Sequence, residues 1–297
     1  MVANRQLFDA VVRHHLDLAR YTRREASAIL RLLERHDARL IAMFRRRLPH
    51  IRPGDISGAR VRAILATVRE MRLEAWRDAH GVLRDDLVEL GRVEAAALAR
   101  IVQSSIPFPV TVNPIRAATL REVVTGRPFA GGHNATSTLR QWFSRMAQGD
   151  QQRLMGAVQL GVRNQETVDT MVRRIAGTRR LGFADGVLAM SRREAETAVR
   201  TAVNHVANAA QVEFGRANDD VIVGWQWVVM LDERLCPICA PRGGRFVPNG
   251  DRRPPDGMES LGDVSPPTHP NDRCALVPVL DVEGLASQVP DQLQEAA

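Results

Sequence analysis

Hydrophobic residues recur every three or four positions along much of the first 216 residues, which is the spacing of amphipathic helices. The pattern is clear in residues 1–48 and returns in residues 57–103. Pro49 and the Arg-Pro-Gly-Asp stretch at 52–55 interrupt it. We therefore expect two long helical stretches separated by a turn, with Gly81 and Gly91 as candidate breaks within the second.

Further helices are expected over residues 115–125, 137–162 and 191–216, and over a segment that ends at Gly177. Asn164 is the expected N-cap of the helix that ends at Gly177, and Ser191 with Glu194 has the spacing of a capping box. Before these helices, residues 106–114 contain three prolines in a β-prone run. Proline lacks a backbone donor, so this run is expected to be a linker or an edge segment, and we place a domain boundary here.

The hydrophobic period changes from helical to alternating after residue 220. Bulky apolar residues occupy every odd position from Val221 to Val229, as in a strand with one buried face. Residues 245–247 and 275–279 are two further short strand candidates, and the stretch 248–268 between them is rich in Pro, Gly and Asp. The expected fold class is α+β, mainly α-helical with a small C-terminal β element.

Chemistry enters with the cysteines, because the chain has only three, all between positions 236 and 274. Cys236 and Cys239 form a Cys-x-x-Cys turn after the long strand, and His269 with Cys274 lies beyond the polar loop. Two thiolates, an imidazole and a third thiolate are a donor set that suits tetrahedral zinc. We expect one structural zinc ion per chain, held by Cys236, Cys239, His269 and Cys274, because four protein ligands leave no position for a reacting water. The β element would then be organised around this structural zinc site.

Two other interpretations of the same residues stay open. The cysteines and the histidine could carry no metal, or Cys236 and Cys239 could form a redox pair. A redox Cys-x-x-Cys normally begins a helix in a thioredoxin-like unit, whereas the sequence after Cys239 does not have a helical pattern.

The residues around these ligands resemble the signature of phage Mu F-like minor head proteins, also called head morphogenesis proteins. The resemblance rests on Asp232-Glu-Arg-Leu-Cys-Pro-Ile-Cys239, on Gly243-Gly-Arg-Phe246, and on Pro266-Pro-Thr-His-Pro-Asn-Asp-Arg-Cys274, and it covers about residues 119–280. Family members often have a cysteine where this chain has Asp272. Cys274 is then the thiol left to complete the set, although Asp272 could supply an oxygen ligand.

The resemblance implies a structural virion protein of a tailed phage and not an enzyme. Such proteins join the head in few copies, usually beside the portal, and help produce a head competent for DNA packaging or delivery. The implied partners are the portal protein and the major capsid or scaffold protein, and the implied location is the phage head near the portal vertex, after assembly in the host cytoplasm. Together with the residue pattern, the resemblance gives an expected organisation of an Arg-rich helical region 1–114, a head morphogenesis domain 115–283 with a zinc-binding segment 221–280, and a flexible tail 284–297.

Charge changes the picture of the N-terminal region. The formal net charge is +7, and every one of the 41 basic residues is arginine. Residues 20–72 hold 14 arginines against 5 acidic residues. Arg-rich helices of this kind can contact packaged DNA through its backbone, contact an acidic protein surface, or form a solvated face. No apolar run is long enough to cross a bilayer, so we expect no membrane partner.

Two functions from other classes remain as alternatives. An HNH-like metal-dependent nuclease is one, because His269-Pro-Asn271 lies near a Cys-x-x-Cys turn. A zinc-containing DNA-binding protein is the other, although it needs a base-reading helix beside the metal, which the sequence after Cys239 does not offer. Asn204 and Asn208 are interpreted as groups that hydrogen-bond a helix to a strand, and Asp232 and Arg234 as braces of the zinc turn.

Overall fold

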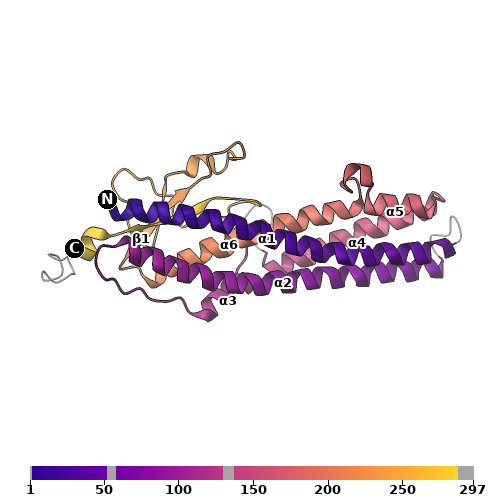
Figure 1. The fold of residues 1–297 in the computed structure, drawn as a ribbon, viewed down its shortest axis with the longest axis horizontal. Helices are drawn as coiled ribbons and strands as arrows, with labels where there is room; N and C mark the ends of the chain where they lie inside the picture. The colour runs from indigo at the N-terminus through magenta and orange to yellow at the C-terminus, as the bar shows by residue number, and fades with distance from the viewer. Residues whose placement is uncertain (1, 52–57, 130–136, 287–297) are drawn as a thin grey trace. The chain divides into compact units, whose positions relative to one another are not determined.

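The computed structural model describes residues 2–51, 58–129 and 137–286 (Figure 1). The described residues are mainly helical, with one three-stranded antiparallel sheet, as the sequence predicts. The helices are α1 (Val2–Arg47), α2 (Ala59–Ser105), α3 (Ala117–Thr125), α4 (Leu139–Arg163), α5 (Val168–Ala176), α6 (Val187–Ala217) and α7 (Val282–Ala286). The strands are β1 (Ile222–Val228), β2 (Phe246–Pro248) and β3 (Ala275–Leu280). None of the described helices is long and apolar enough to cross a membrane.

The chain forms two compact units, and each takes up separate stretches of sequence. Unit 1 comprises Met1–Arg23, Asp85–Thr138 and Arg200–Ala297, and unit 2 comprises Arg24–Arg84 and Leu139–Val199. The helices α1, α2 and α6 therefore contribute residues to both units. A domain boundary at residue 114, with a domain over 115–283, stays a prediction. Residues 284–286 belong to α7, and the rest of the predicted tail, 287–297, lies outside the described residues.

The sheet of unit 1 has the order β2-β1-β3. Trp225 and Trp227 of β1 are buried with Phe214 of α6 and Leu276 of β3 in one hydrophobic cluster. The alternation predicted from the sequence holds at these two tryptophans, whereas Val223 is only half-buried and Ile222 is buried. The reason is a shift in the β1–β3 register between Ile222 and Gly224, which reverses the faces of the residues before it.

The free edge of β3 is closed by side chains from two helices. Leu276 N donates to Asn208 Oδ1 of α6 (3.2 Å), and Leu280 N donates to Asn4 Oδ1 of α1 (2.9 Å). Between them, Pro278 has no N–H to offer. Because the edge donors are already used, the strand is protected against pairing with another chain, and the helices are joined to the sheet.

Gly215 near the end of α6 allows the helix to pack against the sheet. A methyl group at this position would overlap the ring of Trp225, which is buried. Gly156, on an exposed face of α4, has open space at the same position.

We therefore expect Gly215→Ala to destabilise the protein by about 1–3 kcal/mol, because it overpacks a closed core. Gly156→Ala is the matched control and is expected to stabilise its helix by up to about 1 kcal/mol, because alanine is the better helix former. Urea unfolding midpoints followed by circular dichroism check both. Equal effects of the two substitutions would contradict the proposed packing.

The candidate breaks at Gly81 and Gly91 are wrong, because both glycines lie inside the single helix α2. Two predicted helix starts are also wrong. The N-cap of α5 is Thr167, whose side chain accepts a hydrogen bond from Thr170 N, and Asn164 lies in the turn before it. The helix α6 begins at Val187, so Ser191 lies inside it and forms no capping box. The Ser191 hydroxyl instead donates to Asp150 of α4 (2.6 Å), and Glu194 pairs with Arg153 of α4. Tertiary partners therefore use both side chains that the sequence assigned to a cap.

A buried ionic cluster lies in unit 2. Arg72 of α2 donates to Asp37 of α1 (2.7 Å) and to Asp150 of α4 (2.6 Å). Asp150 also accepts hydrogen bonds from Trp76 and Ser191, and Arg192 donates to Asp37. Four helices thus contribute charged or polar groups to one enclosed network.

Candidate metal centre

The Cys-x-x-Cys turn follows β1 and turns back on itself after the second cysteine. Cys236 O accepts hydrogen bonds from Cys239 N (3.1 Å) and Ala240 N (3.0 Å), and Cys239 N also lies 3.3 Å from Cys236 Sγ. A short 3-10 helix, Ala240–Arg242, follows. This local geometry brings both sulfurs to the same side of the turn.

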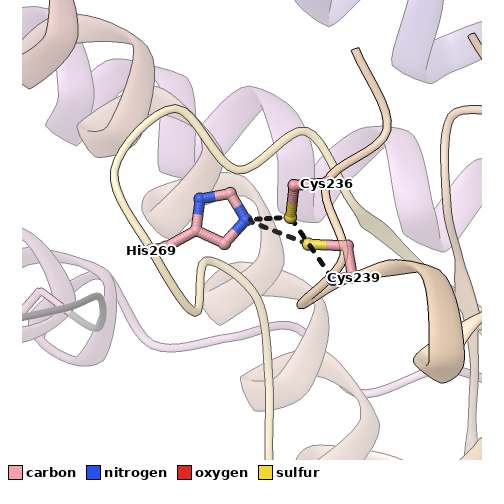
Figure 2. Close-up of side chains that lie close together, drawn as sticks. All are labelled: Cys236, Cys239 and His269. Carbon is pink, nitrogen blue, oxygen red and sulfur yellow. Dashed lines mark hydrogen bonds between the residues drawn. The ribbon is translucent and has the colours of Figure 1, made fainter. Parts of the chain in front are cut away.

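Three of the four predicted ligands converge (Figure 2). His269 Nε2 lies 3.1 Å from Cys236 Sγ and 3.0 Å from Cys239 Sγ, and the three atoms lie within 4.8 Å of one another. Ligand atoms around tetrahedral zinc stand about 3.4–3.8 Å apart, given Zn–S near 2.3 Å and Zn–N near 2.0–2.1 Å. The two nitrogen–sulfur distances are somewhat shorter than this, whereas the donor set and its convergence suit one zinc ion.

The tautomer of His269 also suits a metal ligand. Its Nδ1 lies 2.9 Å from the carbonyl oxygen of Pro270, which can only accept a hydrogen bond. Nδ1 is then the protonated nitrogen, and Nε2 keeps its lone pair toward the two sulfurs. A backbone carbonyl on the second ring nitrogen is the usual outer partner of a metal-bound histidine.

Cys274 is placed differently from the other three predicted ligands. Its sulfur groups with Cys239 Sγ and a carboxylate oxygen of Asp272, all within 4.8 Å of one another, and not with His269. Cys239 thus belongs to both groups. The four predicted ligands surround one small region, but the structure does not bring all four into a single set.

Asp272 is buried and already well hydrogen-bonded. Its carboxylate accepts from Thr268 N (2.7 Å), the Thr268 hydroxyl (3.1 Å) and Cys274 N (2.8 Å). Burial raises its pKa, but these hydrogen bonds outweigh burial and leave the pKa below its ordinary value. The carboxylate therefore holds the turn between His269 and Cys274 in shape.

Burial also raises the pKa of two of the three thiols, those of Cys239 and Cys274. The pKa of Cys239 is raised to about 11, first by burial and then by its hydrogen bond with Cys236, and that of Cys274 is raised by burial and by Asp272. In contrast, hydrogen bonds from the Cys-x-x-Cys backbone outweigh burial at Cys236 and lower its pKa. A divalent cation between these sulfurs would favour their thiolate forms and release protons on binding.

Side chains on one face of α6 form hydrogen bonds with the loop that contains His269 and Cys274. Thr201 accepts from Asn271 N (3.0 Å), Asn204 donates to Asp272 O (2.8 Å), and Asn208 donates to Cys274 O (3.4 Å). Residues at spacings of three and four lie on the same side of a helix, so these side chains meet successive loop residues. The predicted helix–strand role is confirmed for Asn208, which also accepts from Leu276 N of β3, whereas Asn204 bonds the loop before that strand.

Arg242 connects the two ligand segments, which are the Cys236–Cys239 turn and the loop that contains His269 and Cys274. Nothing in the sequence pattern indicates this role. Its guanidinium donates to Ile238 O (2.9 Å) within the Cys-x-x-Cys turn and to the Thr268 hydroxyl (3.1 Å) beside His269. It also lies 5.6 Å from the ring centre of Trp227 in β1, within range of a cation–π interaction. As one arginine among 41 basic residues, it carries no motif that could have singled it out.

Asp232 braces the turn from the outside. It pairs through both oxygens with the Arg273 guanidinium (2.6 and 2.7 Å) and accepts from Arg234 N (2.9 Å). The hydrogen bonds from Arg273 and Arg234 lower the pKa of Asp232 to about 2. The predicted brace is confirmed for the Asp232 side chain, whereas Arg234 acts through its backbone amide.

The chain was compared with known proteins. Residues 150–277 match the family model described as Phage Mu protein F like protein, which confirms the resemblance found in the sequence. The matched part contains β1, β2, the Cys-x-x-Cys turn and the His269–Cys274 loop. No curated protein and no solved structure matches the chain. The family suggests a role in phage head morphogenesis.

Proposed function

Because residues 150–277 match the phage Mu protein F like family, we propose that this chain is a structural minor protein of a tailed-phage head. In this role it joins the assembling head in the host cytoplasm, binds the portal protein together with the major capsid or scaffold protein, and stays near the portal vertex. There it helps to form a head competent for DNA packaging or delivery. The observation that carries the proposal is the family match, which includes the ligand segments.

Particle composition tests this role. Quantitative mass spectrometry of purified particles from the phage that encodes the chain should find it in few copies relative to the major capsid protein. Chemical cross-linking of those particles should join it to the portal protein. A particle fraction without the chain would exclude the virion role, and cross-links to the tail alone would exclude the portal vertex.

A structural zinc ion is the second part of the proposal. Cys236, Cys239 and His269 are its first three ligands, and Cys274, which shares Cys239 as a neighbour, completes the set. When bound, zinc supplies a rigid cross-link between the turn after β1 and the loop before β3. The residues 249–274 need such a link because most of this loop carries no helix or strand of its own.

The arrangement of His269 favours this structural role over a nuclease. A general base must reach the attacking water, but Nε2 of His269 faces two sulfurs and Nδ1 is bonded to Pro270 O. The full chain is therefore expected to leave supercoiled plasmid intact in Mg²⁺ or Mn²⁺. Cleavage that disappears in His269→Ala would contradict the structural role.

Contact with packaged DNA is the third part, and the charge of the two units supports unit 2 as the part that makes it. Unit 2 holds 24 arginines against 13 acidic residues, a net charge of +11, whereas unit 1 holds 17 against 21, a net charge of −4. Of the described residues of unit 2, nineteen arginines but only five acidic residues are exposed. The basic surface is thus a property of residues 24–84 together with 139–199, and not of the whole region 1–114.

The exposed run Arg45, Arg46 and Arg47 in the last turn of α1 offers a direct test. Replacing all three with glutamine should weaken binding of the full chain to double-stranded DNA by at least about tenfold near 0.1 M salt. It should also reduce the slope of log K against log salt by up to about 2.7, since each phosphate contact contributes about 0.9. Fluorescence anisotropy with a labelled duplex measures both quantities.

The matched control is the pair Arg252→Gln and Arg253→Gln, which changes exposed arginines of the acidic unit 1. This control should keep the affinity and nearly the whole salt slope of the wild-type chain. If the two sets of substitutions weaken binding equally, DNA contact is not directed by unit 2.

A further inference from the structure

The segment between α5 and α6 in unit 2 is a compact projection that ends in two exposed hydrophobic side chains. It runs from Thr178 to Gly186 and stands out from the helices on either side (Figure 1). Leu181 is 50% exposed and Phe183 is 44% exposed, whereas the neighbouring helices bury Ile175 and Leu188 completely or nearly so. Large apolar groups held outside a core in this way are typical of a contact surface when they lie together.

The two ends of the segment are fastened to each other. Asp185 accepts hydrogen bonds from both Thr178 N (2.7 Å) and the Thr178 hydroxyl (2.9 Å). At the base, a methyl group on Gly186 would overlap the backbone of Ala176 and Gly177. Only glycine therefore permits the two ends of the segment to approach this closely.

The tip is also ordered by its own backbone. Thr178 O accepts from Leu181 N (3.1 Å) and Phe183 N (2.9 Å), and Leu181 O accepts from Ala184 N (3.0 Å). Gly182 and Phe183 both have left-handed backbone angles, with φ of 57° and 62°. A bulky residue takes this conformation at a steric cost, and the hydrogen bonds of the segment hold it there. The chain thus holds Phe183 outward in a defined position.

The charges beside the tip are mainly positive, since Arg179 and Arg180 stand against Asp185, whose carboxylate also interacts electrostatically with Arg180. Arg179 and Arg180 are exposed, and the only acidic residue of the segment, Asp185, is already bonded to Thr178. The projection therefore presents two apolar side chains next to two guanidinium groups.

We propose that Leu181 and Phe183 dock into an apolar pocket, rimmed by carboxylates, on another protein of the phage head. The proposal rests on the proposed function, because that function supplies the protein neighbours. Aromatic and arginine side chains dominate the energetics of many interfaces, and carboxylates at the rim would match Arg179 and Arg180. Since the loop is ordered before contact, docking loses little conformational entropy.

To test this, the chromosomal copy of the gene is removed and each full-length variant is expressed in trans while heads assemble. Mass spectrometry of the purified heads then gives the number of copies of the variant per head. Leu181→Ser with Phe183→Ser should lower incorporation at least tenfold, and Arg179→Glu with Arg180→Glu should lower it severalfold. The matched control is Leu160→Ser, which removes a similarly exposed apolar side chain (46%) from α4 of the same unit. It should incorporate like the wild-type chain, and circular dichroism should show that all variants are folded.

The outcomes separate the docking proposal from the proposed function. If the wild-type chain is absent from heads, the virion role fails and the docking proposal fails with it. If the wild-type chain is present and the loop variants incorporate equally, the docking proposal alone is overturned. Binding of the wild-type chain to vesicles of phosphatidylglycerol, lost in the Leu181→Ser and Phe183→Ser variant, would assign the tip to lipid and overturn it as well. A loss of DNA affinity in that same variant would assign the tip to DNA, with the same consequence.

Discussion

Replacing Cys239 with serine is expected to release the zinc ion and to destabilise the region between β1 and β3 more than any other single substitution in unit 1. Cys239 is 3% exposed and lies in both groups of ligand atoms, with Cys236 and His269 on one side and with Asp272 and Cys274 on the other. Zinc binding contributes about 10–16 kcal/mol in isolated zinc-finger peptides, and part of the loop here is also held by α6, so we expect a loss of at least about 5 kcal/mol.

Elemental analysis and thermal unfolding measure this effect. The wild-type chain should hold about one zinc ion and lose stability in a chelator, and Cys239→Ser should hold none and no longer respond to the chelator. All three cysteines of the chain lie in the site, so Ser260→Ala, an exposed position in the loop between the ligand segments, serves as the matched control. A wild-type chain without metal, with unchanged stability in chelator, would defeat the zinc proposal.

The fourth ligand can be identified in the same experiment. With Co²⁺ in place of zinc, the intensity of the sulfur-to-metal absorption reports the number of bound thiolates. If Cys274 is a ligand, Cys274→Ser should lower this intensity by about a third, in proportion to the sulfurs removed. Asp272→Asn should leave it unchanged and reduce only the affinity for the metal, because Asp272 orients the loop through Thr268 and Cys274.

The sequence predicts the candidate metal ligands better than it predicts the side chains that hold them in place. The candidate ligands can be recognised because cysteine is rare in this chain and because Cys236 and Cys239 have the Cys-x-x-Cys spacing of many metal sites. Arg242 and Thr268 join the two ligand segments, but arginine and threonine occur throughout the chain and their pairing is set by a fold that spans 26 residues. Asp272 is visible as a departure from the pattern, whereas its role as a hydrogen-bond acceptor appears only in the structure.

The helices show the same contrast: their apolar faces can be predicted from the sequence, whereas the partners of their polar side chains cannot. Hydrophobic periodicity predicts α1, α2, α4 and α6, because burial of an apolar face is a local property of the sequence. The start of α6 is predicted wrongly, since a serine followed by glutamate at the third position is a valid cap only if tertiary partners leave it free. Ser191 is 1% exposed and bonded to Asp150, and no local signal distinguishes a serine that caps a helix from one that serves a buried carboxylate.

Asp150→Asn is expected to have the largest effect on unit 2. The Asp150 carboxylate is fully buried and accepts from Arg72 (2.6 Å), Trp76 (2.8 Å) and Ser191 (2.6 Å). An asparagine can keep its oxygen toward Arg72 and Trp76 and turn its NH₂ group toward the Ser191 hydroxyl, which can accept, but it removes the buried negative charge. It also leaves two arginines, Arg72 and Arg192, against one remaining carboxylate in the cluster. Removing one partner of a buried ionic group costs about 3–5 kcal/mol.

The matched control is Glu194→Gln, which weakens the ion pair with Arg153 between the same two helices. That pair is partly exposed, with 26% and 33% of the two side chains accessible, so its loss should cost less than about 1 kcal/mol. Chemical denaturation gives both values. Hydrogen exchange of the α4 amides shows whether the loss is confined to unit 2. Equal effects of Asp150→Asn and Glu194→Gln would mean that burial does not set the strength of the cluster.

A double substitution separates the attraction within the cluster from the cost of an unpaired charge. Arg72→Met with Asp150→Leu removes one positive and one negative group and leaves Asp37 paired with Arg192 (3.1 Å). Apolar replacements of a buried ion pair are often neutral, so the double variant should be more stable than the sum of its single variants by several kcal/mol. A double variant that loses the full sum would show that Arg72 and Asp150 act independently. The contact among the four helices would then depend on packing and not on the balance of charge inside it.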